Sequence, residues 1–152
     1  MTTYERILSE LGDGLGIALS PDPDGIAEVA AEGRSVLLRA DETGERELQA
    51  FTIVATAPKG GFPDKTLRAA LEMNLFGREV AGHHLGLFAN SLLLSATLPL
   101  VGLGAEELAE RILVLVRLAG DLAGRLSDAA DDVSSAADVA IGGMRGDGFL
   151  AV

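Results

Sequence analysis

The feature that most constrains this chain is one long apolar stripe near its C-terminal end. In "GAEELAERILVLVRLAGDLAGRL", apolar residues recur at alternating spacings of four and three: Leu108, Ile112, Leu115, Ala119, Leu122 and Leu126. This spacing places them on one side of an α-helix, and neighbouring apolar residues widen that side. The stripe therefore predicts a long helix that buries one face.

The first half of the chain predicts one helix and then strands. "TYERILSELG" places its apolar residues on one helical side, with Thr3 as the N-cap and Gly12 as the stop. Three segments rich in strand-forming residues follow: "IAEVAAE", "SVLLRAD" and "RELQAFTIVAT". The turns between them are short, which is typical of an antiparallel meander.

The second half adds a helix and a hairpin before the long helix. "DKTLRAALEMNLFG" is a helix that Asp64 caps and Gly77 ends, and "GHHLGLF" and "LLLSATLPL" form two more strands. The expected order is α-β-β-β-α-β-β-α, an α+β fold with a five-stranded, mostly antiparallel twisted sheet and three helices. Residues 1–127 form the domain, and residues 128–152 are predicted to be a mobile tail, acidic and rich in small residues.

Charge is distributed unevenly along the chain. Residues 1–50 hold 11 acidic and 4 basic side chains, residues 51–127 hold 7 of each, and residues 128–152 hold 5 acidic and 1 basic, for a net charge of −11. Such an acidic chain repels phosphate backbones, which argues against nucleic-acid binding. The neutral middle is the region where two copies can associate at little electrostatic cost.

Composition narrows the class of protein further. The mean hydropathy of +0.31 is high for a chain without membrane spans, so some apolar surface is expected to meet a partner. No apolar run approaches the ~18 residues of a membrane span, and the N-terminus lacks the pattern of a secretory signal. The absence of cysteine excludes disulfides, thiol nucleophiles and thiolate metal sites.

The adjacent histidines His83 and His84 are the first candidates for chemistry. We place both in a strand, where neighbouring side chains point to opposite faces. A pair splayed in this way cannot chelate one metal ion, and the chain has no other histidine. A structural or interfacial role is therefore expected.

Other catalytic patterns do not match. Gly12, Gly14 and Gly16 miss the G-x-G-x-x-G spacing, Lys59 lacks a phosphate-loop frame, and no serine has a G-x-S-x-G elbow. Acidic pairs lie in a turn between prolines and in the C-terminal tail, where solvation explains them. The sequence predicts no enzyme, no metal and no cofactor.

At this point the pattern resembles a known family. "LRAALEMNLFG", followed by "LGLF", a short turn, "LLLSATLPL" and the final helix, is similar to the class I chaperones of bacterial type III secretion, the Tir-chaperone-like family. The element order, acidity and small size agree, and the resemblance covers about residues 3–126. The Ala/Gly-rich "VAGHH" and the segment after Ser127 depart from the family pattern.

The resemblance implies a function and its partners. Members are cytoplasmic bacterial homodimers that hold the N-terminal segment of a secreted effector in extended form, without nucleotide. The effector and a second copy are thus the expected partners, with the secretion ATPase as a further one. Neither nucleic acid nor membrane insertion is expected.

Each of the two main partners is expected to have its own surface. The effector is expected to contact an apolar stripe on the first helix and the strands after it: Ile7, Leu8, Leu11, Ile17, Leu19, Leu37, Phe51 and Ile53. The homodimer is expected to form through the second helix and the strand that follows: Leu67, Leu71, Asn74, Leu75, His83 and Leu85.

Two alternatives remain open from the sequence. One is a carrier of small apolar ligands, in which the aliphatic strands enclose a cavity. The other is a regulatory adaptor with the same fold that binds a folded partner. A carrier would act as a monomer, whereas a secretion chaperone would be dimeric and would co-purify with one effector.

Overall fold

Three helices and five strands make up the described part of the chain. The computed structural model describes residues 1–144 and places the side chains of residues 1–128 other than Phe76. Its elements are α1 (Thr3–Leu15), β1 (Ile26–Ala31), β2 (Arg34–Ala40), β3 (Glu47–Thr56), α2 (Asp64–Phe76), β4 (His84–Phe88), β5 (Ser91–Pro99) and α3 (Ala105–Met144). This order confirms the predicted α+β fold class.

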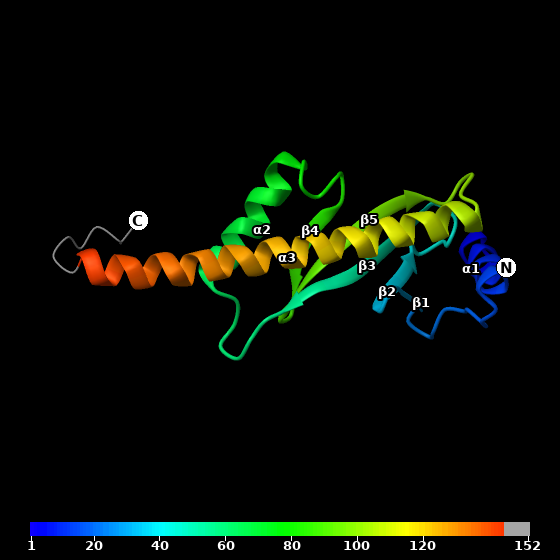
Figure 1. Cartoon of the computed structure of the whole chain (residues 1–152). Coiled ribbons are helices and arrows are strands. Elements are labelled where there is room, and N and C mark those ends of the chain that lie inside the picture. Colours follow the sequence, from blue (N-terminus) through cyan, green and yellow to red (C-terminus); the bar gives the residue numbers. More distant parts are fainter. Residues whose placement is uncertain (145–152) are drawn as a thin grey trace.

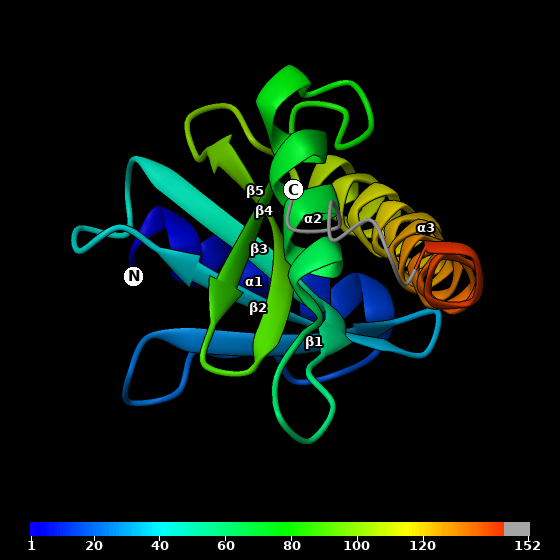
Figure 2. The same cartoon turned by 90° about the vertical axis from the view of Figure 1, so that its left-hand side faces the viewer.

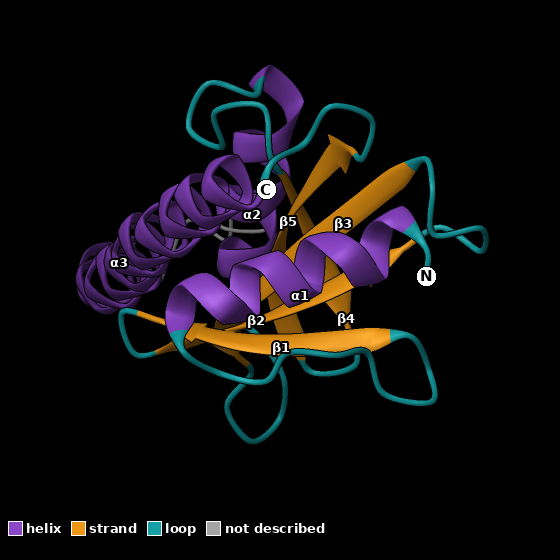
Figure 3. Cartoon of the chain, turned by 90° about the vertical axis from the view of Figure 1, so that its right-hand side faces the viewer, coloured by secondary structure: helices purple, strands orange, loops and turns teal. Residues whose placement is uncertain are grey.

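All five strands lie in one antiparallel sheet. Its strand order is β1-β2-β3-β5-β4, so β1 and β4 are the two edges. α1 and α3 lie across the same face of the sheet (Figure 3), and α2 contacts α3 and β4 (Figures 1 and 2). The other face of the sheet carries no described helix.

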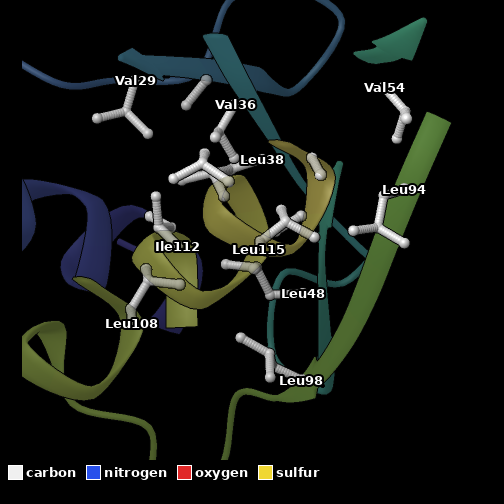
Figure 4. Close-up of a cluster of buried hydrophobic side chains, with 14 of the residues drawn as sticks. Val29, Val36, Leu38, Leu48, Val54, Leu94, Leu98, Leu108, Ile112 and Leu115 are labelled. Atoms are coloured by element: carbon white, nitrogen blue, oxygen red, sulfur yellow. The ribbon is translucent and has the colours of Figure 1, made fainter. Parts of the chain in front are cut away.

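The core lies between the sheet and the two helices on it. The predicted stripe of α3 is buried at every position, from Leu108 to Leu126. Strand residues meet it from the sheet, with Leu48 and Leu94 among the fully buried ones (Figure 4). Each buried leucine contributes about 1.5–3 kcal/mol relative to leaving it exposed, so this layer supplies most of the driving force for folding.

The N-terminus of α1 is held by its own cap and by the turn between β2 and β3. Thr2, rather than the predicted Thr3, is the N-cap: its hydroxyl accepts from the Glu5 N–H at 3.1 Å, and the Glu5 carboxylate accepts from the Thr2 N–H at 2.8 Å. The Glu45 carboxylate accepts from the N–H of Thr3 at 3.1 Å. Gly44 allows this close approach, because its φ is +70° and an added Cβ would lie 3.0 Å from Thr2. α1 therefore has a fixed position over the sheet.

Tyr4 also fixes α1 to the sheet. Its buried hydroxyl lies 2.7 Å from the Leu38 carbonyl oxygen and 3.2 Å from that of Gly25, and it donates to them. Burial raises the pKa of Tyr4 to about 12, so the phenol stays protonated and keeps donating at neutral pH.

The predicted ends of α1 and of the last helix were wrong. α1 continues past Gly12 to Leu15 and ends at Gly16, which adopts φ +70°. α3 continues past Ser127 to Met144, and it projects beyond the sheet (Figure 1). Alanine-rich sequence without proline supports helix, so an acidic, small-residue composition was a poor signal for a helix end. The mobility predicted for residues 128–144 stays a prediction, and residues 145–152 lie outside the described chain.

Candidate functional site

The face of the sheet opposite α1 and α3, which we call the outer face, carries several apolar side chains on its central strands. Leu37 on β2 pairs directly with Phe51 on β3, and both are half-buried. Ile53, two residues further along β3, is 50% exposed and pairs with Leu93 on β5. Side chains alternate along a strand, so these residues face away from α1 and α3. Leu37, Phe51 and Ile53 thus lie together, as the expected effector surface requires.

Three residues of the expected effector surface are in the core instead. Ile7 and Leu8 are fully buried, and Leu11 is 3% exposed. The expectation that this stripe is available at the surface was wrong, because α1 needs it to pack against the sheet and α3. The periodicity of the helix was correct, but an apolar stripe cannot reveal whether it faces the core or a partner.

Two further residues of the expected effector surface, Ile17 and Leu19, follow α1 and lie apart from the outer sheet face. Ile17 is exposed and its N–H donates to the Gly12 carbonyl at 2.9 Å, while Leu19 is half-buried against the core. Both therefore belong to the end of α1, on the helix-covered face. The eight residues expected to bind the effector do not form one groove.

A second set of exposed apolar side chains lies on α2 and β4, two elements in contact with each other. Leu71 and Leu75 are 68% and 74% exposed, and at the end of β4 Leu87 and Phe88 are 57% and 73% exposed. We refer to these four residues as the α2–β4 patch. The strand predicted at the interface, Gly82 to Phe88, includes Leu87 and Phe88, but sequence reasoning did not single them out. Their position at the end of a strand in the neutral segment was the available signal.

The other residues expected at the dimer contact are engaged inside the chain. Leu85 is buried and Leu67 is half-buried against the core. The Asn74 amide donates to the Leu85 carbonyl at 2.6 Å and accepts from the Leu85 N–H at 2.8 Å. These contacts dock α2 on β4. The residues that make them therefore hold in place the two elements that carry the α2–β4 patch.

One of the two histidines lies in the strand as predicted, and the other does not. His83 precedes β4 rather than lying in it, and its Nδ1 lies 3.0 Å from the Val80 carbonyl oxygen. His84 begins the strand, is exposed and pairs with Ser95. In the part of the chain that the structure describes, no three His, Asp or Glu side chains gather as metal ligands.

Charged contacts tie the β1–β2 turn to α3. Arg117 of α3 donates two hydrogen bonds to one Glu32 oxygen, at 2.8 and 3.1 Å, and Nε also lies 3.3 Å from the other. This pairing lowers the pKa of Glu32 and raises that of Arg117. Both groups are exposed, so the pair orients the turn and contributes little stability.

No helix among residues 1–144 combines the length and the apolar character that crossing a membrane requires.

Comparisons with known proteins identify the family. The model of the Tir chaperone protein (CesT) family matches residues 6–123. The match spans most of the domain, from α1 to the middle of α3, and the chain belongs to this family. The predicted resemblance is confirmed.

Solved structures with the same fold agree with this assignment. One chain of the ExsC–ExsE complex matches with a TM-score of 0.68 at 18% identity, covering 83% of this chain and 97% of that one. The HopA1–SchA chaperone–effector complex matches with a TM-score of 0.60 at 19% identity, covering 80% and 94%. The Yersinia pestis type III secretion chaperone SycH, in complex with a stable fragment of YscM2, matches with a TM-score of 0.59 at 24% identity, covering 78% and 98%. No curated protein matches the chain in sequence.

Proposed function

We propose that this chain is a type III secretion chaperone that binds the N-terminal segment of a secreted effector in extended form. In this role it keeps the effector soluble and competent for secretion. Membership of the Tir chaperone protein family carries the proposal. The names of two similar solved structures support it, one a chaperone–effector complex and the other a type III secretion chaperone in complex with a fragment of YscM2.

The client surface that we propose is the outer sheet face. Leu37, Phe51 and Ile53 present apolar atoms there. Burying one leucine-sized side chain is worth about 1.5–3 kcal/mol, so a few anchors offset much of the cost of ordering an extended segment. Ile17 and Leu19 form a separate contact at the end of α1, for a client that passes around the edge of the sheet.

We propose that the α2–β4 patch forms the twofold interface of a homodimer. Four exposed apolar side chains on two adjoining elements are unusual for a free surface. The segment around them has no net charge, so two copies meet without repulsion. In such an isologous contact, Leu71 and Leu75 of one copy meet the same patch of the second copy. Asn74 and His83 keep the backbone that carries the patch in place.

The remaining expectations belong to the same proposal. The chain acts in the bacterial cytoplasm, without catalysis and without a cofactor, and the secretion ATPase receives the complex. The carrier alternative gains no support, since buried aliphatic side chains fill the described space between the sheet and its helices (Figure 4).

Co-expression with candidate secreted proteins encoded near this gene tests the function. We expect a stable complex that survives size-exclusion chromatography and that needs only the N-terminal segment of the secreted protein. Leu37→Asp combined with Ile53→Asp should lose the complex while circular dichroism shows a folded chain.

The matched control is Gln49→Asp, which adds a charge at an exposed, polar position of the same strand and face. It should retain the complex. A folded double variant that still binds its effector would place the client elsewhere.

A further inference from the structure

The last part of α3 extends beyond the rest of the domain. α3 is one continuous helix from Ala105 to Met144, but the family match ends at residue 123. We refer to residues 127–144 as the α3 extension, and at ~1.5 Å per residue it is about 27 Å long. It projects past the end of the sheet and past α2 (Figure 1). Membership of the family therefore does not explain this element.

The α3 extension projects on the side of the molecule that carries the α2–β4 patch. α2 and the extension both come toward the viewer in Figure 2, and β4 lies beside α2. α2 also packs against α3. A second copy that docks on the α2–β4 patch therefore occupies the space beside the extension. The outer face of the sheet, where we place the client, lies on the side away from α3 (Figure 3).

The sequence of the α3 extension continues the apolar spacing of the core. The spacing of three and four residues that is buried from Leu108 to Leu126 goes on in the same helical phase. Its further positions are Ala130, Val133, Ala137, Ile141 and Met144. They belong to the side of the helix that meets the sheet earlier in α3, but none of the described strands reaches this far (Figure 1). An apolar helix side of this length favours a partner over water.

Charge distinguishes between possible partner surfaces. The residues on the other side of the extension include Asp128, Asp131, Asp132 and Asp138. Residues 127–144 contain no lysine or arginine, so two extensions packed on each other would repel. Residues 57–70, which form the start of α2 and the loop before it, hold exposed Lys59, Lys65 and Arg68 against one acid, Asp64. A second copy brings this basic segment to the contact, where it complements the extension.

We propose that the α3 extension packs through its apolar side on the second copy of the chain, beside α2, and so enlarges the dimer contact beyond the α2–β4 patch. This inference rests on the proposed function, because it requires the homodimer. The mobility predicted for this segment then applies to a single copy, and dimerisation holds the segment in place.

Paired substitutions on the two sides of the extension test the contact. Val133→Asp with Ile141→Asp adds two charges to the apolar side, and Ser127→Asp with Ser135→Asp adds two to the other side at the same spacing. Both pairs lie beyond Leu126, the last described core residue, so circular dichroism should show a folded chain for each. In sedimentation equilibrium, the first pair should raise the dimer dissociation constant at least about tenfold and the second should change it less than about twofold. Equal constants for the two variants, or an unchanged dimer that no longer binds its client, would overturn the proposal.

Cross-linking keeps the test valid if the first variant does not fold. The chain has no cysteine, so Ala137→Cys and Ser135→Cys each carry a single benzophenone label, one on the apolar side and one on the other side. In a mixture of isotope-labelled and unlabelled chains, the label at position 137 should cross-link to residues 57–88 of the second copy, and the label at position 135 should do so much less. Cross-links confined to one chain, or equal yields from the two positions, would contradict the proposal.

The failures of the two proposals are distinguishable. If Leu71→Asp dissociates the dimer but Val133→Asp with Ile141→Asp does not, this inference is wrong and the proposed dimer stands. If the unmutated chain is a monomer at micromolar concentration, the proposed dimer is wrong and this inference falls with it.

Discussion

The two ends of the sheet use apolar residues in opposite ways. At the β1 end, the apolar stripe of α1 is buried, and the surface that remains is acidic. At the β4 end, α2 buries little of its own stripe and leaves Leu71 and Leu75 in solvent, in a segment with no net charge. The same kind of helical pattern thus closes a core at one end and is left exposed at the other. In our proposal, the first region binds a foreign segment and the second contacts a second copy.

The largest effect is expected at the buried end. Leu8→Asp places an unpaired charge in the fully buried core and should cost at least about 4 kcal/mol, enough to unfold the chain. Circular dichroism and urea titration measure this loss. A variant with native stability would show that α1 is not packed as described.

The equivalent change at the exposed end should spare the fold. Leu71 is largely exposed, so Leu71→Asp buries no charge within one chain. It should nevertheless dissociate the dimer, because two such charges would meet across a twofold contact. Light scattering at micromolar concentration should give a dimer for the unmutated chain and a folded monomer for the variant. A monomer in the unmutated chain would remove the α2–β4 patch as an interface.

A smaller effect is expected from Asn74→Ala. It removes both hydrogen bonds to Leu85 and leaves a part-buried N–H and C=O without partners, at a cost of about 2 kcal/mol. Urea unfolding checks the value, with Asn90→Ala as a control because the side chain of Asn90 has no described hydrogen bond. Equal costs for the two variants would show that the Asn74 contacts do not hold α2 on β4.

The smallest effect concerns acid stability at the turn between β2 and β3. Asp41 accepts hydrogen bonds from Thr43 and from the N–H groups of Arg46 and Glu47, which hold its pKa well below the usual value. A lowered folded pKa means that the contribution of Asp41 is complete above pH ~4, the unfolded value, and is lost as pH falls through the folded value.

Asp41→Asn should therefore be less stable than the unmutated chain at pH 7, with a difference that shrinks below pH ~4. Unfolding followed from pH 7 to pH 2 measures this trend, and Asp24→Asn, whose carboxylate accepts no described hydrogen bond, is the control. A difference that stays constant with pH would contradict the assignment.

The fold was predictable because its signals are local. The 4-3 spacing from Leu108 to Leu126 and the alternation along β3 each determine an element and its buried side. The caps were less predictable, because Thr2 and Thr3 are equally good candidates and only the position of Glu5 decides between them. The end of α3 was missed because an alanine-rich sequence is compatible with both a helix and a tail.

The candidate surfaces were predicted only in part, because the exposure of a side chain depends on its tertiary neighbours. Leu8 and Leu71 look alike in sequence, since each lies on the apolar side of a helix, and burial depends on which neighbours the tertiary fold supplies. The contacts of Asn74 with Leu85 join side chain and backbone, and no periodic pattern encodes such pairs. Exposure and these contacts therefore needed the structure.

Hydrogen exchange of the chain with and without its client tests the central claim most directly, which is that the two ends of the sheet serve two different partners. Adding the client should protect peptides from β1, β2 and β3 and leave residues 64–88 unchanged. Diluting the chain until the dimer dissociates should deprotect residues 64–88 and leave β1 unchanged. Client protection confined to residues 64–88, or dilution effects at β1, would contradict the account.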